Sequence, residues 1–119
     1  MAEHNELGKI GEQMAVAYLI KNGYTIKEQN WRFQKAEIDI IAQKKDVLAV
    51  VEVKTRTTDA FGEPQDFITA KKIKLLVKAI EEYVVTKNLD VEVRLDVIAI
   101  IKNKNETKIT HLEDAFFHF

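Results

Sequence analysis

Two periodicities of apolar and polar residues divide the chain into helices and strands. Apolar residues at helical spacing predict helices over residues 5–22 and 69–84. Runs rich in strand-forming residues predict four strands, over residues 24–33, 37–42, 47–54 and 91–101. The order is therefore α-β-β-β-α-β. Because a helical segment connects the last two strands, we expect a crossover connection, a parallel strand pair and a mixed sheet in one α/β domain over residues 1–119.

The first predicted helix carries two stripes of residues at helical spacing. The stripe expected to face the core is Leu7, Ile10, Met14, Ala17 and Tyr18. The neighbouring stripe is Gly8, Glu12, Ala15 and Leu19. Its small residues would let the helix lie close to the sheet and bring Glu12 with it, although Glu12 also fits an ordinary exposed helix position. Gly23 is the expected C-terminal cap of this helix, and Thr69 is the expected N-cap of the second.

The second and third predicted strands carry charged residues where core strands are normally apolar. They are joined by the polar residues 43–46, so we expect a hairpin. Side chains alternate between the faces of a strand. The residues expected on a shared face are Glu37, Asp39 and Ile41 in the second strand, and Leu48, Val50, Glu52 and Lys54 in the third.

This alternation gathers Asp39, Glu52 and Lys54 in one patch of the sheet. Leaving a buried charge without its partner costs about 3–5 kcal/mol, so these groups should be paired, bound to a metal or placed at a solvated cleft. The patch is therefore the candidate functional site. The alternative is a structural network in which Lys54 neutralises the two carboxylates.

Composition excludes several classes of protein. A chain of 119 residues with 46% hydrophobic content is long enough for one real core. It contains no cysteine, which excludes disulfides and thiolate zinc sites, and its three histidines lack the spacing of a metal site. No apolar run is long enough to span a membrane and no signal peptide is present, so we expect a cytoplasmic protein. A net charge of −1 supplies no global attraction to nucleic acid, which leaves binding to a local patch.

Three further segments allow two interpretations each. Residues 57–68 contain Gly62 and Pro64 and form either a substrate flap or a plain crossover. Residues 106–119 are expected to add a short edge segment, with a Phe-rich end that either packs back or meets a partner. Lysines that form either a solvated surface or a phosphate-binding rim are Lys21, Lys27, Lys35, Lys71, Lys72, Lys74 and Lys78.

The chain resembles the PD-(D/E)xK nuclease superfamily in three features: Asp39 on one strand, Glu52-Val53-Lys54 on the next strand, and Glu12 on the leading helix. This superfamily includes restriction enzymes, RecB-type nucleases and Holliday-junction resolvases. Within it, the chain resembles the YraN-type bacterial proteins, which are described as endonuclease-like. Further matches are Gly8, Gly11, Gly23-Tyr24, Asn30-Trp31-Arg32, Glu37-Ile38, Val51, Thr55-Arg56, Phe61-Gly62, Pro64, Lys72 and Asp96-Val97. The chain departs from the family at Ala36, where a glycine is usual.

The resemblance implies a three-layer, restriction-endonuclease-like core and metal-dependent hydrolysis of phosphodiester bonds in DNA, with branched or processed DNA as one substrate class. Asp39, Glu52, the Val53 carbonyl and Glu12 are oxygen donors of the kind that Mg²⁺ or Mn²⁺ prefers. Lys54 would orient or help deprotonate the attacking water. The resemblance also implies residues that would support the metal ligands or contact the substrate, namely Glu37, Arg56, Lys72 and Asp96. Many resolvase-like nucleases are dimers, so a homodimer is also expected.

Two other functions stay open on the sequence. One is a nucleic-acid-binding module that keeps the nuclease fold without turnover. The other is a protein-interaction module that uses the Phe-rich tail or residues 57–68. The intact set of Asp39, Glu52 and Lys54 favours the nuclease, since a binding module does not need all three.

Overall fold

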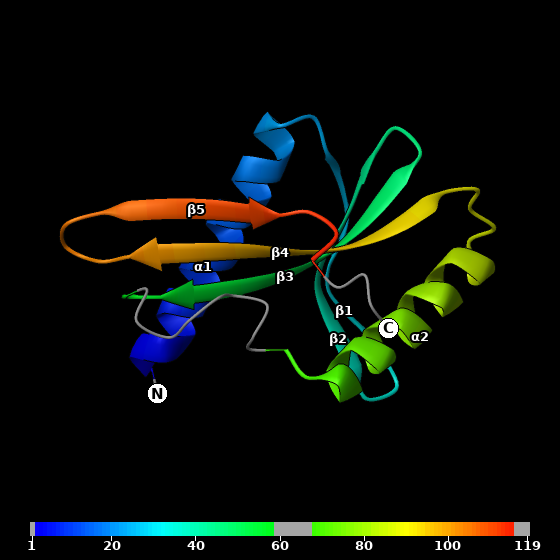
Figure 1. Ribbon diagram of the computed structural model, residues 1–119, viewed down its shortest axis with the longest axis horizontal. Coiled ribbons are helices and arrows are strands. Elements are labelled where there is room, and N and C mark those ends of the chain that lie inside the picture. Colours follow the sequence, from blue (N-terminus) through cyan, green and yellow to red (C-terminus); the bar gives the residue numbers. More distant parts are fainter. Residues whose placement is uncertain (1, 59–67, 116–119) are drawn as a thin grey trace.

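A five-stranded sheet lies between two helices, and the computed structural model describes residues 2–58 and 68–115, with side chains from residue 6 onward (Figure 1). The helices are α1 (Ala2–Lys21) and α2 (Ala70–Thr86). The strands are β1 (Thr25–Phe33), β2 (Ala36–Lys44), β3 (Val47–Arg56), β4 (Glu92–Lys102) and β5 (Thr107–Leu112).

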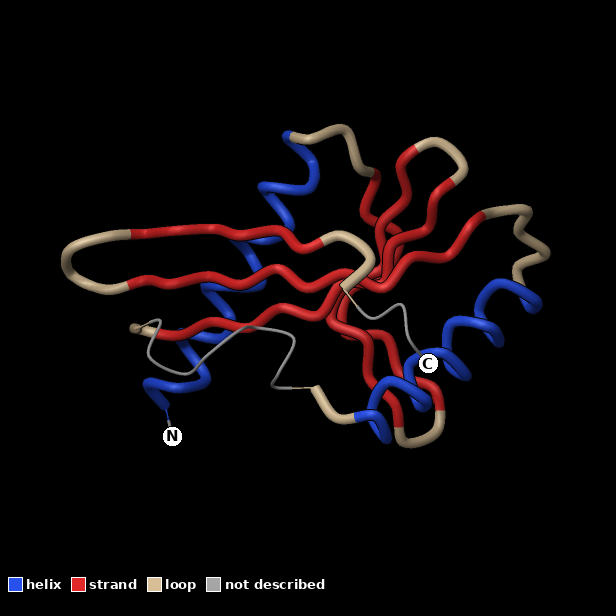
Figure 2. Tube along the Cα trace, viewed as in Figure 1, coloured by secondary structure: helices blue, strands red, loops and turns tan. Residues whose placement is uncertain are grey.

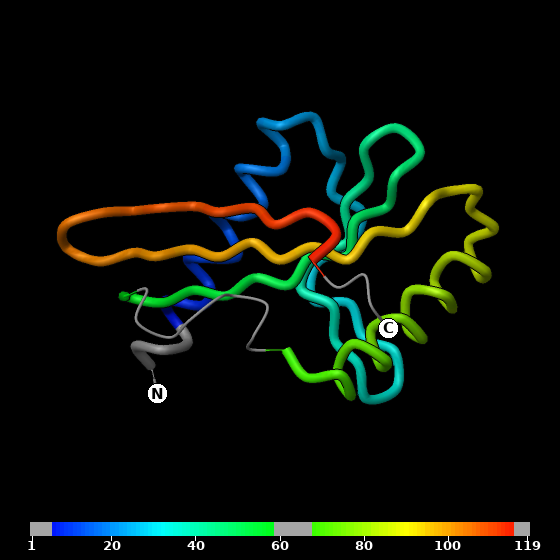
Figure 3. Tube along the Cα trace, viewed as in Figure 1, coloured from blue at the N-terminus to red at the C-terminus, as the bar shows by residue number. Residues whose placement is uncertain are grey.

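The strands follow the order β1-β2-β3-β4-β5 across the sheet. All neighbours are antiparallel except β3 and β4, which run parallel from Val47 opposite Glu92 to Arg56 opposite Ile101. Figure 3 shows these two strands side by side although α2 lies between them in the sequence. The predicted mixed sheet is confirmed, and β5 is the short edge segment expected within residues 106–119.

Helix α1 ends as its sequence predicts but buries a different stripe. Gly23 has φ +91°, and the Tyr24 N–H donates to the Leu19 carbonyl at 2.9 Å, which closes the last turn. Ala15 and Leu19 are fully buried, whereas Ala17 is exposed. The expectation that Ala17 faces the core is therefore wrong, and the stripe with the smaller residues lies against the sheet.

Helix α2 follows the prediction closely. The Thr69 side chain accepts a hydrogen bond from the Lys72 N–H at 3.1 Å and so caps the first turn. Its buried residues recur at helical spacing, namely Ile73, Leu76, Ala79, Ile80 and Tyr83.

Each helix covers one face of the sheet with its own apolar layer. The layer under α1 includes Ile40, Ala42, Ala49, Val51 and Ile98. The layer under α2 includes Ile38, Ile41, Leu48, Val50 and Val97. These two layers with the sheet between them are the predicted three-layer α/β arrangement.

The alternation expected along residues 37, 39 and 41 of β2 is wrong. Ile38 and Ile41 both belong to the layer under α2, whereas Ile40 lies under α1. On β1, Gln29 is opposite Ile40 and Trp31 is opposite Ile38, so Asn30 lies between them at φ +52°. This φ lies in the left-handed region, outside the range of regular strands, and the strand pair also shifts register between Ile26 and Glu28.

In the part of the chain that the structure describes, neither helix has the length and apolar character needed to cross a membrane. Most of the predicted flap, residues 59–67, and the Phe-rich end, residues 116–119, lie outside the described residues.

Candidate functional site

Strands β2 and β3 separate at the candidate site. Their pairing runs from Lys44 opposite Val47 to Ile40 opposite Val51 and stops there. Beyond that point β2 pairs only with β1 and β3 only with β4, and Figure 2 shows the first pair turning away from the second. Asp39 and Glu52 are the next residues on the two strands, so both lie where the sheet opens.

The Asp39 carboxylate bridges this opening. Its Oδ2 accepts a hydrogen bond from the Val53 N–H at 2.9 Å, which satisfies a donor of β3 that β2 no longer reaches. Burial raises the pKa of Asp39, although the Val53 N–H and the ammonium groups of Lys72 and Lys54 act in the opposite direction.

Glu52 is a buried carboxylate with one paired oxygen. Its side chain is 2% exposed, and Oε1 lies 2.8 Å from Nζ of Lys72. Oε2 is buried without a hydrogen-bond partner among the described residues. Burial and the neighbouring Asp39 raise the pKa of Glu52, while Lys72 partly offsets both effects. The site therefore concentrates negative charge that a single lysine only partly neutralises.

The two lysines of the site have different environments. Burial alone would lower the pKa of Lys72, but the hydrogen bond to Glu52 and the negative charges of Glu52, Asp39 and Glu37 together outweigh burial and leave that pKa raised. Burial and the nearby Lys72 ammonium lower the pKa of Lys54. Within the described chain, Lys54 forms no ion pair. Lys72 therefore pairs directly with a carboxylate, whereas Lys54 acts on Asp39 and Glu52 through its charge without an ion pair.

Glu12 approaches the same opening from α1. Burial and the Asp39 carboxylate raise the pKa of Glu12, and a hydrogen bond with the Asn30 side chain opposes them. The helix can come this close because Gly11, the residue before Glu12, lies directly against the Thr55 side chain of β3. The expectation that small residues bring Glu12 toward the sheet holds for Ala15, which is fully buried, but not for Gly8, where an added Cβ would meet no atom within 4 Å. The close approach is made by Gly11, which lies outside the predicted stripe.

The four residues expected to support the metal ligands or contact the substrate do not all lie at the site. Lys72 lies in the site, and Glu37 lies beside it with its carboxylate 3.0 Å from Nε of Arg32. Arg56 donates from Nη1 to the Thr55 carbonyl. Asp96 is separate from the site. Its carboxylate binds Arg94 and His111, and His111 in turn contacts Tyr18 of α1, so this cluster lies on the face of the sheet that α1 covers.

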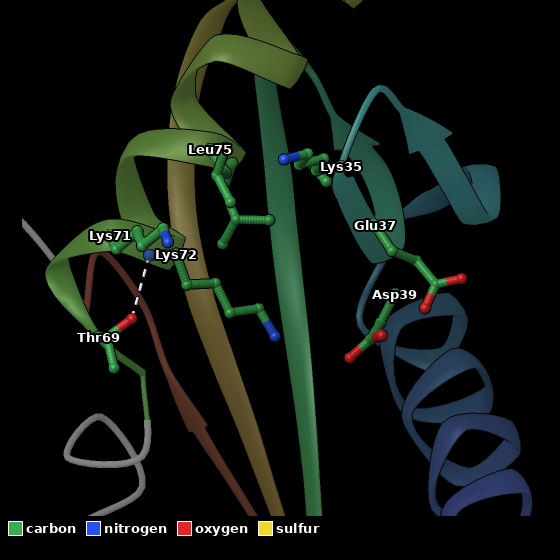
Figure 4. Close-up of a pocket in the computed structure, with 9 residues that line it drawn as sticks. Lys35, Glu37, Asp39, Thr69, Lys71, Lys72 and Leu75 are labelled. Carbon is green, nitrogen blue, oxygen red and sulfur yellow. Dashed lines mark hydrogen bonds between the residues drawn. The ribbon is translucent and has the colours of Figure 1, made fainter.

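A cleft of about 330 Å³ lies next to the opening between α2 and the β1–β2 turn. Figure 4 shows Lys71, Lys72 and Leu75 on the α2 side, with Lys35, Glu37 and Asp39 on the opposite side. A bound molecule would therefore have access to Asp39 from this cleft.

The oxygen donors of the site fit a hard divalent cation. No three acidic or histidine side chains of the described residues come together closely enough to hold a metal ion on their own. Mg²⁺, however, is commonly held by one or two carboxylates together with water and substrate phosphates. Asp39, Glu52 and the Val53 carbonyl supply such a set, and the unpartnered Oε2 of Glu52 is a donor available to a cation.

Sequence reasoning missed two features of this region. It placed Lys72 outside the central group, because Glu52 and Lys72 are on different elements and their contact depends on how α2 crosses the sheet. It also set His111 aside for lacking metal-like spacing, whereas His111 binds Asp96 at 2.8 Å. The sequence signals for Lys72 were its match to the YraN-type proteins and its position in the first turn after Thr69.

Comparison with known proteins gives one consistent match. The model of a family described as "Uncharacterised protein family UPF0102" matches residues 11–100, a span that contains Glu12, Asp39, Glu52, Lys54 and Lys72. The chain is 60% identical over 119 residues to a UPF0102 protein of Flavobacterium psychrophilum and to one of Christiangramia forsetii, with full coverage of both chains in each case. It is 45% identical over 117 residues to a UPF0102 protein of Bacteroides thetaiotaomicron, which covers 98% of this chain and 97% of the relative.

Proposed function

The chain belongs to the uncharacterised protein family UPF0102, and we propose that it acts as a metal-dependent DNA endonuclease that hydrolyses phosphodiester bonds, with branched or processed DNA among its substrates. Membership agrees with the YraN-type resemblance, while placement in the PD-(D/E)xK superfamily is part of the proposal. The observation that carries it is the meeting of Asp39 with a buried, half-paired Glu52 where β2 and β3 separate.

Each residue of the site has a chemical role in this proposal. Asp39, Glu52 and the Val53 carbonyl would hold Mg²⁺ or Mn²⁺, with Glu12 close enough to orient a water through a hydrogen bond. The bound cation would polarise the phosphate and offset charge that develops on it. Lys54, whose pKa is lowered, would position the attacking water and accept or share its proton. One P–O bond forms to the water oxygen, the bond to the leaving oxygen breaks, and the leaving oxygen takes up a proton.

Lys72 supports this assignment as a counter-charge. Its ammonium holds one oxygen of Glu52 and leaves the other free. In the absence of a cation it therefore limits the repulsion between the Glu52 and Asp39 carboxylates.

A Mn²⁺ titration by calorimetry on the wild type, Asp39→Ala and Asp90→Asn tests the metal site without requiring the right substrate. Asp90 is exposed and serves as the control for loss of a carboxylate. We expect binding that is retained in Asp90→Asn and lost in Asp39→Ala. Equal binding in all three proteins, or no binding with a DNA duplex also present, would contradict the metal site.

Cleavage of a panel of linear, nicked and branched DNA tests the reaction itself. We expect Mg²⁺- or Mn²⁺-dependent products that disappear in both Glu52→Gln and Lys54→Ala. The second candidate is a nucleic-acid-binding module without turnover, which the Lys72–Glu52 ion pair favours because it already neutralises part of the site. DNA binding without cleavage across the panel would select that candidate.

A further inference from the structure

The cleft beside Asp39 is lined by more lysines than the one that pairs with Glu52. Three lysines reach it, Lys35 from the β1–β2 turn and Lys71 and Lys72 from α2 (Figure 4). The wall that carries Lys35 also supplies two carboxylates, those of Glu37 and Asp39. The α2 wall is therefore cationic and the facing wall carries charges of both signs, around a space large enough for a nucleotide-sized group, since small-ligand sites begin at roughly 300 Å³.

The partners of these groups decide which charges remain available. The Lys72 ammonium is bound to Glu52 at 2.8 Å, and the Glu37 carboxylate is bound to Arg32 at 3.0 Å. Lys35 and Lys71 are both exposed, and neither forms an ion pair with any residue that the structure describes. The cleft that Asp39 lines therefore presents two uncommitted cations.

We propose that this cleft holds the phosphodiester backbone of a polynucleotide, with Lys35 and Lys71 binding phosphates on either side of the one presented to Asp39 and Glu52. The proposal deepens the nuclease assignment, on which it rests for the identity of the ligand. Lysine binds phosphate as a flexible point charge, so this contact is independent of base sequence. Leu75, on the α2 wall, offers an apolar surface to the sugar of the same unit.

The arrangement also explains how a protein with net charge −1 can attract DNA. Exposed cations within a Debye length of about 8–10 Å act together on a polyanion, whereas distant charges are screened. A phosphate backbone in the cleft would meet the lysines first and would be held next to the carboxylates only where a cation or Lys72 offsets them.

The test compares two double variants with the same loss of charge. Lys35→Gln/Lys71→Gln removes the two free cations of the cleft, and Lys74→Gln/Lys78→Gln removes two exposed lysines of α2 that do not line it. Binding of a fluorescein-labelled oligonucleotide of about 16 nucleotides is followed by anisotropy in EDTA, across roughly 50–200 mM salt. EDTA removes divalent cations, so the measurement does not depend on metal binding or cleavage.

We expect the cleft variant to lose about tenfold in affinity and to reduce the slope of log affinity against log salt by about 2, one for each phosphate contact. The α2 control should keep the wild-type slope and bind within about twofold of wild type. Equal losses in the two variants, unchanged binding in the cleft variant, or no binding by the wild type would each overturn the proposal.

A mononucleotide arm separates a polynucleotide from a free nucleotide as the source of the phosphate. Thymidine monophosphate should compete only weakly with the oligonucleotide, because it offers one phosphate site instead of several. Competition as strong as that of the unlabelled oligonucleotide would make the cleft a nucleotide site and overturn the backbone assignment. DNA binding that depends on Lys35 and Lys71, without any cleavage, would support this inference and refute the nuclease. Cleavage that depends on Glu52, with unchanged DNA binding by the Lys35→Gln/Lys71→Gln variant, would support the nuclease and refute this inference.

Discussion

Glu52 is a charged residue in an unfavourable, buried environment. It is 2% exposed, has one oxygen without a hydrogen-bond partner in the described structure, and lies near a second carboxylate. A buried charge of this kind costs several kcal/mol unless it is fully paired. Functional sites often retain such unfavourable groups, and their removal then stabilises the fold while function is lost.

Replacing Glu52 by Gln should therefore raise the free energy of unfolding at neutral pH by about 1 kcal/mol. The amide removes the buried charge and its repulsion with Asp39 but keeps the shape of the side chain. Urea denaturation measures the change, and the same variant should bind no Mn²⁺. A loss of stability would show that Lys72 compensates Glu52 fully and that the carboxylate has a structural role.

Lys72→Met tests the other partner of the same ion pair. It leaves Glu52 without a counter-charge, and we expect a loss of about 2 kcal/mol, less than for a fully buried pair because the Lys72 side chain is 41% exposed. In the double variant Glu52→Gln/Lys72→Met, most of this loss should disappear, since no buried charge remains. A double-mutant cycle in urea measures the coupling, and simple additivity of the two changes would contradict it.

At the scale of elements, periodicity predicted α2 better than α1. The apolar residues of α2 form one stripe, so its buried face follows from the sequence. In α1 the apolar residues are spread around the helix. The face that is buried is the one where the helix backbone comes close to the sheet, and a sequence indicates this only through small residues such as Gly11 and Ala15. The irregular alternation of β2, in which Ile38 and Ile41 share one layer, was also missed, because the residues of β2 alone do not indicate it.

Gly11→Ala and Gly8→Ala form a matched pair that tests this close approach. A Cβ at Gly11 would overlap the Thr55 side chain, whereas a Cβ at Gly8 would meet no atom within 4 Å. We expect Gly11→Ala to lower the free energy of unfolding by about 1–3 kcal/mol. Gly8→Ala should raise it by up to about 1 kcal/mol through helix propensity. Thermal or urea unfolding separates the two, and similar effects of both substitutions would contradict close packing at Gly11.

At the scale of the whole molecule, a second charged cluster ties distant segments together. Asp96 of β4 binds Arg94, His111 of β5 and the Asp114 N–H, while His111 also contacts Tyr18 of α1 at 3.2 Å. His111 and Tyr18 are 93 residues apart, so no local pattern could predict this contact. The candidate site was predictable because its residues lie on neighbouring strands, whereas Lys72 and the Asp96 cluster depend on how the layers pack.

Acid should weaken the fold through Asp96. Burial alone would raise the pKa of Asp96, but His111, Arg94 and the Asp114 N–H outweigh burial and hold that pKa below its usual value. A carboxyl group with a lowered pKa contributes stability above its unfolded pKa of about 3.9 and loses it as the pH falls through the folded value. Wild-type unfolding free energy should therefore decrease below about pH 4 more steeply than that of Asp96→Asn. Asp90→Asn, which removes an exposed carboxylate, should keep the wild-type slope. Urea unfolding between about pH 5 and 2 measures these free energies. If the free energies of wild type and Asp96→Asn fell in parallel with pH, Asp96 would not contribute to the loss of stability in acid.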